Sequence, residues 1–195
     1  MITRNAYSQV SFEVSDSEKL EAKKALIAFK FAIKKIETAS NYLNNLKTPF
    51  KDNAGVSPED VWKSRAALRR FRDKAVDNFN EFKIMAFRCV DFSKEFSSDT
   101  EIVKMVKSFI SNVDILESSV NDFVALFDDL KSAEFPTKIV TLIEKIKKDC
   151  DEIIDLITNR IKKYIQDNII ASSWLDQVGK EKSLTIRKKV PALLK

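Results

Sequence analysis

The sequence of 195 residues contains no histidine and only two glycines. Without histidine the chain cannot form a Ser–His or Cys–His nucleophile pair, and it cannot offer imidazole to a metal ion. The isolated glycines, Gly55 and Gly179, exclude a Gly-rich phosphate-binding loop and a dinucleotide-binding turn. The 29 carboxylates could still supply an acid–base pair, but no spacing indicates one. We therefore expect a protein that is not an enzyme and has no cofactor, metal site or small-molecule substrate.

Long apolar runs are also missing. No stretch approaches the roughly 18 consecutive apolar residues that span a bilayer, and Met1–Asn5 is followed by no apolar run of a secretory signal. The two cysteines, Cys89 and Cys150, lie far apart in the sequence on apolar stripes, which favours buried reduced thiols over metal ligands. A disulfide between two helices is the alternative. These features predict a cytoplasmic protein.

Four long segments repeat apolar residues at alternating spacings of three and four, the period of an amphipathic helix. The first is expected to begin at Ser15 or Ser17, where Ser15 and Glu18 have capping-box spacing, and to end near Leu46. Ser57 and Pro58 predict the start of the second, because serine caps helices and proline favours their first position. The third follows a second capping-box spacing, Ser98 to Glu101, and Pro136 marks the start of the fourth.

Each segment has one apolar stripe that we expect to be buried. In the first segment the stripe is flanked by Ala25, Ala32, Ala39 and Leu46, and its members are Ala22, Leu26, Phe29, Ile33, Ile36 and Leu43. The second stripe consists of Val61, Leu68, Phe71, Ala75, Phe79, Phe82, Ala86, Cys89 and Phe96. The third consists of Ile102, Val106, Phe109, Val113, Leu116, Val120, Phe123, Phe127 and Leu130. The fourth consists of Ile139, Ile143, Ile146, Cys150, Ile153, Ile157 and Tyr164, with Arg160 as the one charged residue on the line.

Helices of about 30 to 38 residues would each be on the order of 50 Å long. Similar lengths and short connections predict an all-α, antiparallel up-down-up-down four-helix bundle with coiled-coil-like packing. Its bounds would be residues 15–178, with an extended segment at 1–14 and a basic tail at 179–195. The alternative is a pair of helical hairpins that close only on dimerisation.

The two ends of the chain show a different, alternating pattern. Val10, Phe12 and Val14 alternate with polar residues, as do Leu184 and Ile186. Period-two alternation is a strand signal, so a short terminal β-ribbon is one interpretation. Frayed ends are the other.

The formal net charge of +5 is concentrated in the tail. Residues 180–195 hold six basic side chains and one acid, and removing them from the totals of 34 and 29 leaves 28 of each sign. Lys182, Arg187, Lys188 and Lys189 are therefore candidates for binding phosphates or an acidic partner. A solvated extension is the alternative, and Pro191 argues against a long membrane-binding helix through the end.

A second basic group opens the second segment, where Arg65, Arg69, Arg70 and Arg72 precede the acidic segment 99–131. One interpretation is that the arginine stems cover apolar surface while the guanidinium groups of Arg65 and Arg72 reach carboxylates of that segment. The other is a ridge that binds phosphates or an acidic partner.

A further candidate surface is apolar. Five residues project away from the stripes, which is a feature of oligomer and partner contacts when such residues cluster. They are Leu20, Ile27, Phe31, Ile84 and Phe87.

These observations favour a non-catalytic helical-bundle interaction protein: a scaffold, an adaptor or an oligomeric accessory subunit. We expect a protein partner or self-association. The alternative is a nucleic-acid-binding subunit that uses the arginines of the second segment and the basic tail, although the balanced body predicts weak binding. A membrane-active bundle is less favoured, because no segment offers a nearly uncharged apolar hairpin.

Overall fold

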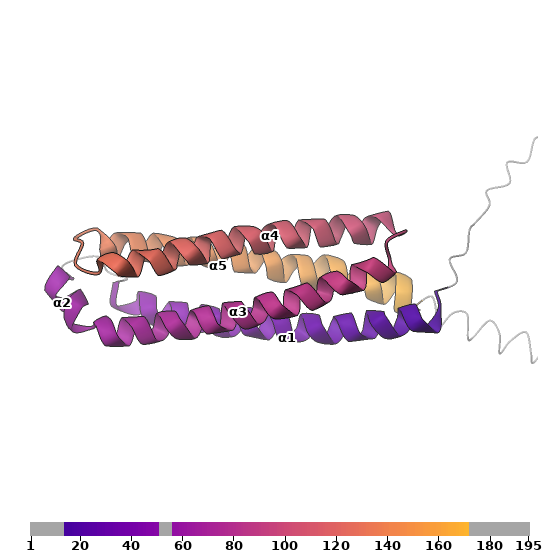
Figure 1. The fold of residues 1–195 in the computed structure, drawn as a ribbon, viewed down its shortest axis with the longest axis horizontal. Coiled ribbons are helices and arrows are strands. Elements are labelled where there is room, and N and C mark those ends of the chain that lie inside the picture. Colours follow the sequence, from indigo (N-terminus) through magenta and orange to yellow (C-terminus); the bar gives the residue numbers. More distant parts are fainter. Residues whose placement is uncertain (1–13, 51–55, 172–195) are drawn as a thin grey trace, which may run out of the picture.

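The computed structural model describes residues 14–50 and 56–171, and in these ranges the chain is entirely α-helical in class, without strands. Its long helices are α1 (Asp16–Lys47), α3 (Arg65–Glu95), α4 (Thr100–Ala125) and a fourth that begins as α5 (Phe135–Asp155). Figure 1 shows them side by side, each antiparallel to the next. The predicted antiparallel four-helix bundle is confirmed.

Shorter elements complete the chain. One turn of 3-10 helix, Thr48–Phe50, follows α1, and α2 (Pro58–Lys63) precedes α3. A second 3-10 turn, Leu126–Asp129, ends α4. Beyond α5 the helix continues through a π-helical segment (Leu156–Ile161), α6 (Lys162–Tyr164) and a second π-helical segment (Ile165–Ile170).

The helix starts follow the capping rules, with one correction. Ser15 caps α1 in a complete capping box with Glu18, and Ser57 caps α2 with Pro58 in its first turn. At α4, however, the cap is Asp99 and not Ser98. The Asp99 carboxylate accepts from the backbone N–H groups of Glu101 and Ile102, so it satisfies two donors where a serine satisfies one.

The second predicted helix is interrupted at Ser64, which separates α2 from α3. Neither glycine nor proline marks this break in the sequence. The carbonyl of Trp62, at this turn, accepts a hydrogen bond from the Arg65 guanidinium at 2.8 Å.

The core of α1 is built mainly on alanine. The residues predicted to flank the stripe, Ala25, Ala32, Ala39 and Leu46, are fully or almost fully buried, whereas Leu26 and Ile33 are only half-buried. Small side chains allow two helices to approach closely, and α1 packs against α3, on which Ala75 and Ala86 are also buried. Four of the six predicted stripe residues, Ala22, Phe29, Ile36 and Leu43, are buried, and the core side of the helix extends to the flanking alanines in place of Leu26 and Ile33.

The remaining stripes are largely as expected. All nine predicted positions of the third segment are buried, and Ser119 joins them. On α3, Phe71 is only half-buried and Phe92 is an additional core residue.

In the fourth helix, Arg160 does not lie on the buried stripe where the sequence placed it. From the end of α5 onward, buried isoleucines recur at a constant spacing of four, at Ile153, Ile157, Ile161, Ile165 and Ile169, with Leu156 buried beside them. In a regular α-helix that spacing would rotate away from the core by 40° at each step, but the wider π-helical turns keep these isoleucines on one face. Arg160 is consequently exposed, and Tyr164 is half-buried at the edge.

Polar contacts at the edges of the core join each pair of neighbouring helices. Lys35 pairs with Glu81 between α1 and α3, and Lys83 pairs with Glu117 between α3 and α4. The Ser119 hydroxyl donates to Asp149 at 2.7 Å between α4 and α5. Between α1 and α5, Lys47 pairs with Glu144 at 2.6 Å and Lys147 donates to Asn44 at 3.0 Å. These contacts favour one register for each pair.

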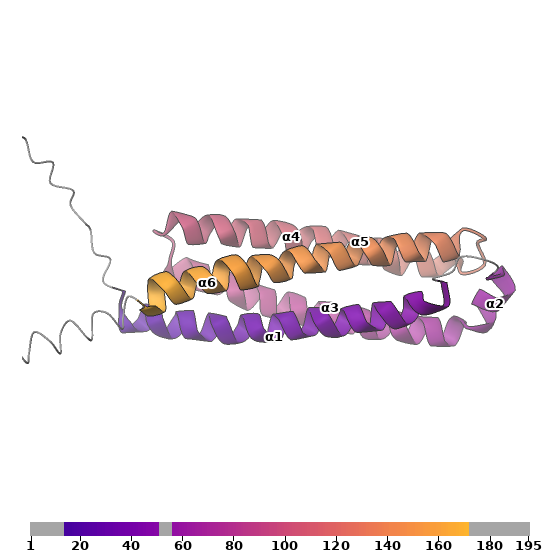
Figure 2. The same ribbon diagram turned by 180° about the vertical axis from the view of Figure 1, so that it is seen from behind.

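The first and last described residues lie at the same end of the bundle, as an up-down-up-down topology requires (Figures 1 and 2). Val14 is half-buried coil here and not strand. The other residues of the predicted ribbon, Val10, Phe12, Leu184 and Ile186, lie outside the described residues. The same holds for the tail candidates Lys182, Arg187, Lys188 and Lys189.

Candidate interaction surfaces

The end of the bundle opposite the described chain ends is closed by a stack around Trp62. Arg65 lies over the Trp62 ring at 4.6 Å, and Lys131 lies over the same ring at 4.4 Å. Cation–π contacts of this kind contribute about 0.5 to 1 kcal/mol at exposed sites. Trp62 therefore joins α2 and α3 to the connection between α4 and α5.

Below this stack lies a chain of phenylalanine rings in edge-to-face contact. Phe50 contacts Phe135, Phe135 contacts Phe127, and Phe127 contacts Phe123, with ring centroids 5.4 to 5.9 Å apart. The Arg72 guanidinium lies 5.0 Å from the Phe127 ring and pairs with Asp73 at 2.7 Å. Arg72 is therefore part of the end of the core.

This geometry separates the four arginines. Arg65 and Arg72 contact aromatic rings, and within the described residues neither pairs with a carboxylate of segment 99–131. The expected ion pairs with that segment are therefore wrong, because ring faces and Asp73 lie closer. Arg69 and Arg70 are exposed and form no ion pair in the described part of the chain. Adjacent residues on a helix point about 100° apart, so these two do not form a common ridge.

The five apolar candidates are all more than half exposed, and they lie on two faces of the bundle. Ile27 and Phe31 of α1 line a groove of about 640 Å³ together with Met85 and Arg88 of α3. Phe87 instead lines a small groove between α3 and α4 with Val90 and Ile110. The candidates therefore do not form a single patch.

The face shared by α1 and α3 has opposite charges on its two helices. The outer ridge of α1, which we call the basic ridge, carries three lysines and three exposed apolar residues: Leu20, Lys23, Ile27, Lys30, Phe31 and Lys34. The outer ridge of α3, the acidic ridge, carries four acids beside one isoleucine and one arginine: Asp77, Glu81, Ile84, Arg88, Asp91 and Glu95. Each set follows helical spacings of three, four and seven, which place its members on one side of the helix.

Sequence reasoning missed both ridges as units, although a signal for them exists. Each lysine of the basic ridge stands three residues after an exposed apolar residue of the same helix. On α3, the acids continue the 4-3 spacing of Ile84 in both directions. Nothing in the sequence, by contrast, brings Lys131 to Trp62, because that contact depends on how the connection after α4 folds.

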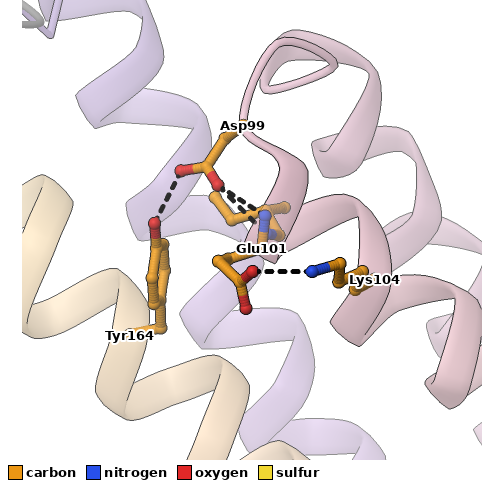
Figure 3. A network of polar contacts seen from close by, with 5 residues as sticks. Asp99, Glu101, Lys104 and Tyr164 are labelled. Carbon is orange, nitrogen blue, oxygen red and sulfur yellow. Dashed lines mark hydrogen bonds and ion pairs between the residues drawn. The ribbon is translucent and has the colours of Figure 1, made fainter.

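The opposite end of the bundle holds a polar network around Asp99 (Figure 3). The Tyr164 hydroxyl donates to Asp99 Oδ2 at 2.8 Å, while Asp99 Oδ1 caps α4. Lys104 pairs with Glu101 at 3.0 Å beside it. Burial and the negative charge of Asp99 raise the pKa of Tyr164 to about 12, so its hydroxyl remains a donor at neutral pH. The network links α4 to the fourth helix and acts as a structural clasp.

The two cysteines are free and buried on different helices. Cys150 contacts Ser40, whereas the Lys35–Glu81 pair places Cys89 level with residue 27 of α1. That separation of 13 residues along α1 corresponds to roughly 20 Å, too far for a disulfide. Burial raises the pKa of both thiols to about 12, which makes them poor nucleophiles.

The described residues contain no group of three or more Cys, Asp or Glu side chains arranged to hold a metal ion. None of the described helices combines the length and apolar character needed to cross a membrane. No known protein family matches the chain, and no curated protein or solved structure is significantly similar to it.

Proposed function

We propose that this protein is a non-catalytic helical-bundle interaction protein that binds a protein partner through the outer face of α1 and α3. The observation that carries the proposal is the exposure of Leu20, Ile27, Phe31 and Ile84, each between 51% and 58% exposed. They lie on neighbouring helices and alternate with the charged residues of the two ridges. An apolar centre with a charged rim is the usual arrangement of a protein-binding surface.

The energetics of the fold support the same proposal. The core is already filled by buried residues on all four long helices, so the exposed side chains are not needed to close it. Burying one large apolar side chain contributes about 1.5 to 3 kcal/mol. Burial of four such residues on one face would therefore favour a partner contact.

The proposal is tested by affinity capture with the full chain as bait in its native cell extract. We expect a protein partner that the wild-type chain retains and an Ile27→Lys, Phe31→Lys variant loses. The matched control is Ile115→Lys on α4, a residue that is 48% exposed and belongs to neither ridge. Equal recovery by all three baits, or no partner at all, would contradict the proposal.

A further inference from the structure

The charges on the α1–α3 face have a complementary arrangement. The basic ridge carries three positive charges, and the acidic ridge carries four negative charges and one positive charge, so their net charges are +3 and −3. Lys23, Lys30 and Lys34 form no ion pair in the described part of the chain, and neither do Asp77 and Glu95. These charges are therefore available to a partner.

Two limiting orientations of the two-fold axis bring a second copy of this chain onto the face. If the two-fold axis runs across the helices, α1 lies on α1 and the lysines of both copies repel one another. If the axis runs along the helices, α1 of each copy lies on α3 of the other, and the basic ridge meets the acidic ridge twice. A two-fold interface repeats every contact, so each pairing of a basic with an acidic ridge occurs twice in the dimer.

The register between the helices preserves the matching along the axis. The Lys35–Glu81 pair sets Asp91 level with residue 25 of α1, only two residues from Lys23. In the same way, Asp77 is level with residue 39, five residues from Lys34. Because the axis along the helices keeps these levels unchanged, this arrangement would place Lys23 of one copy near Asp91 of the other, whose carboxylate also pairs with Lys94 of its own helix.

We propose that the outer face of α1 and α3 binds a second copy of this chain in a parallel two-fold dimer, with the basic ridge of each copy on the acidic ridge of the other. This inference rests on the proposed function and names its partner. Exposed ion pairs alone contribute little, so the burial of Leu20, Ile27, Phe31 and Ile84 supplies the affinity while the charges select the orientation.

The same face fits an anionic lipid surface less well. Lysines beside exposed apolar residues attract acidic headgroups. The acidic ridge, however, lies beside them and would have to approach the same headgroups. A partner with both signs of charge, such as another copy, is the better match.

Sedimentation velocity of the full chain, from low micromolar to several hundred micromolar concentration, tests the proposal. We expect a concentration-dependent dimer whose dissociation constant rises at least about tenfold in Ile27→Ser, Phe31→Ser. The control, Ile115→Ser with Val124→Ser on α4, should dimerise like the wild type. A monomer at every concentration, or a dimer unaffected by the ridge substitutions, overturns the proposal.

Charge reversal provides a second test that does not depend on removing apolar surface. One variant carries Lys23→Glu and Lys34→Glu, and the other carries Asp77→Lys and Glu95→Lys. We expect each variant alone to dimerise at least about tenfold more weakly, and an equimolar mixture to recover a heterodimer. Failure of the mixture to associate would overturn the charge matching.

Disulfide trapping tests the orientation. Lys23→Cys in one chain and Asp91→Cys in another should form a mixed disulfide, because the parallel arrangement brings these positions together. The native thiols should not compete, because they are buried and have raised pKa values. Trapping of an Ile27→Cys homodimer in its place would indicate the crossed axis and overturn the parallel arrangement.

The failures of the two proposals are distinguishable. A monomer that still captures a different protein through Ile27 and Phe31 overturns the dimer and leaves the proposed function standing. Flotation of a monomeric chain with anionic phosphatidylserine vesicles, lost in the Lys23→Glu, Lys34→Glu variant, overturns the dimer in favour of a membrane.

Discussion

Cys89 and Cys150 carry ionisable groups inside the apolar core. Their pKa is about 12 in the folded chain and 9.0 ordinarily, so the unfolded chain loses these protons first as the pH rises. The folded state is therefore favoured by the neutral thiols below pH 9, and this contribution is lost between pH 9 and 12. Tyr164 acts in the same direction above its ordinary pKa of 10.0.

We expect the free energy of unfolding, measured by urea denaturation, to fall as the pH is raised from 9 towards 12. Cys89→Ala with Cys150→Ala should lower stability at neutral pH, because each substitution removes buried volume, but it should flatten the alkaline slope. A slope equal to that of the wild type would show that the thiols do not cause it.

Asp99 performs two tasks, since it caps α4 and accepts a hydrogen bond from Tyr164. We expect Asp99→Ala to cost about 1 kcal/mol through loss of the cap, and Tyr164→Phe to cost about 1 kcal/mol through loss of the hydrogen bond. The measurement is urea denaturation at neutral pH. In a double-mutant cycle the two losses should not add, because the first substitution already removes the acceptor of the second.

At the scale of the helices, the alanines of α1 determine how closely α3 approaches. Ala32 and Ala39 are fully buried, so a larger side chain there would force the helices apart. We expect Ala32→Leu to destabilise the bundle by about 1 to 3 kcal/mol, measured by thermal and urea denaturation. Ala66→Leu, at an exposed position of α3, is the control and should change stability by less than about 0.5 kcal/mol.

The helices also show what sequence periodicity can predict. The pattern from Ile102 to Leu130 identifies every buried apolar position, because regular spacing and large side chains agree there, and it misses only the buried Ser119. On α1 the prediction placed Leu26 and Ile33 in the core because they are large, whereas the small alanines beside them are the buried residues that allow close packing. The isoleucines that recur every four residues after Ile153 could not be predicted to share one buried face, because they do so only where the helix has π-helical turns.

The interaction surfaces were less predictable than the fold. Exposure of Leu20, Ile27 and Phe31 follows from their positions opposite the stripe of their own helix. Which exposed residues share a face depends on helix neighbours and register, and these are set by contacts such as Lys35–Glu81. The separation of Arg70 from Arg65 and Arg72, by contrast, follows from the helical period of the segment itself.

At the scale of the whole molecule, opposite charges are distributed around the bundle. The first 179 residues contain equal numbers of basic and acidic side chains, 28 of each. Two of the four clustered arginines are also engaged by Trp62 and Phe127. A dedicated nucleic-acid-binding domain usually has a marked excess of basic side chains, which these 179 residues do not have.

We therefore expect the full chain to bind DNA or RNA weakly near physiological salt in fluorescence anisotropy. Arg69→Ala with Arg70→Ala should change that binding by less than about twofold. Affinity from counterion release grows with the number of phosphate contacts, and two arginines that point in different directions are expected to make few of them. A tight, steeply salt-dependent complex that Arg65→Ala with Arg69→Ala abolishes would favour the nucleic-acid-binding alternative.

The start of α1 and the end of the fourth helix lie at the end of the bundle that holds the Asp99–Tyr164 clasp, whereas α2, which carries Trp62, lies at the far end (Figures 1 and 2). A tether joined to the chain at either place would hold the bundle by this one base. The Trp62 stack would then lie at the end of the bundle farthest from the point of attachment. In the parallel dimer both Trp62 stacks would lie at the same end, so that one attachment site could present two of them together.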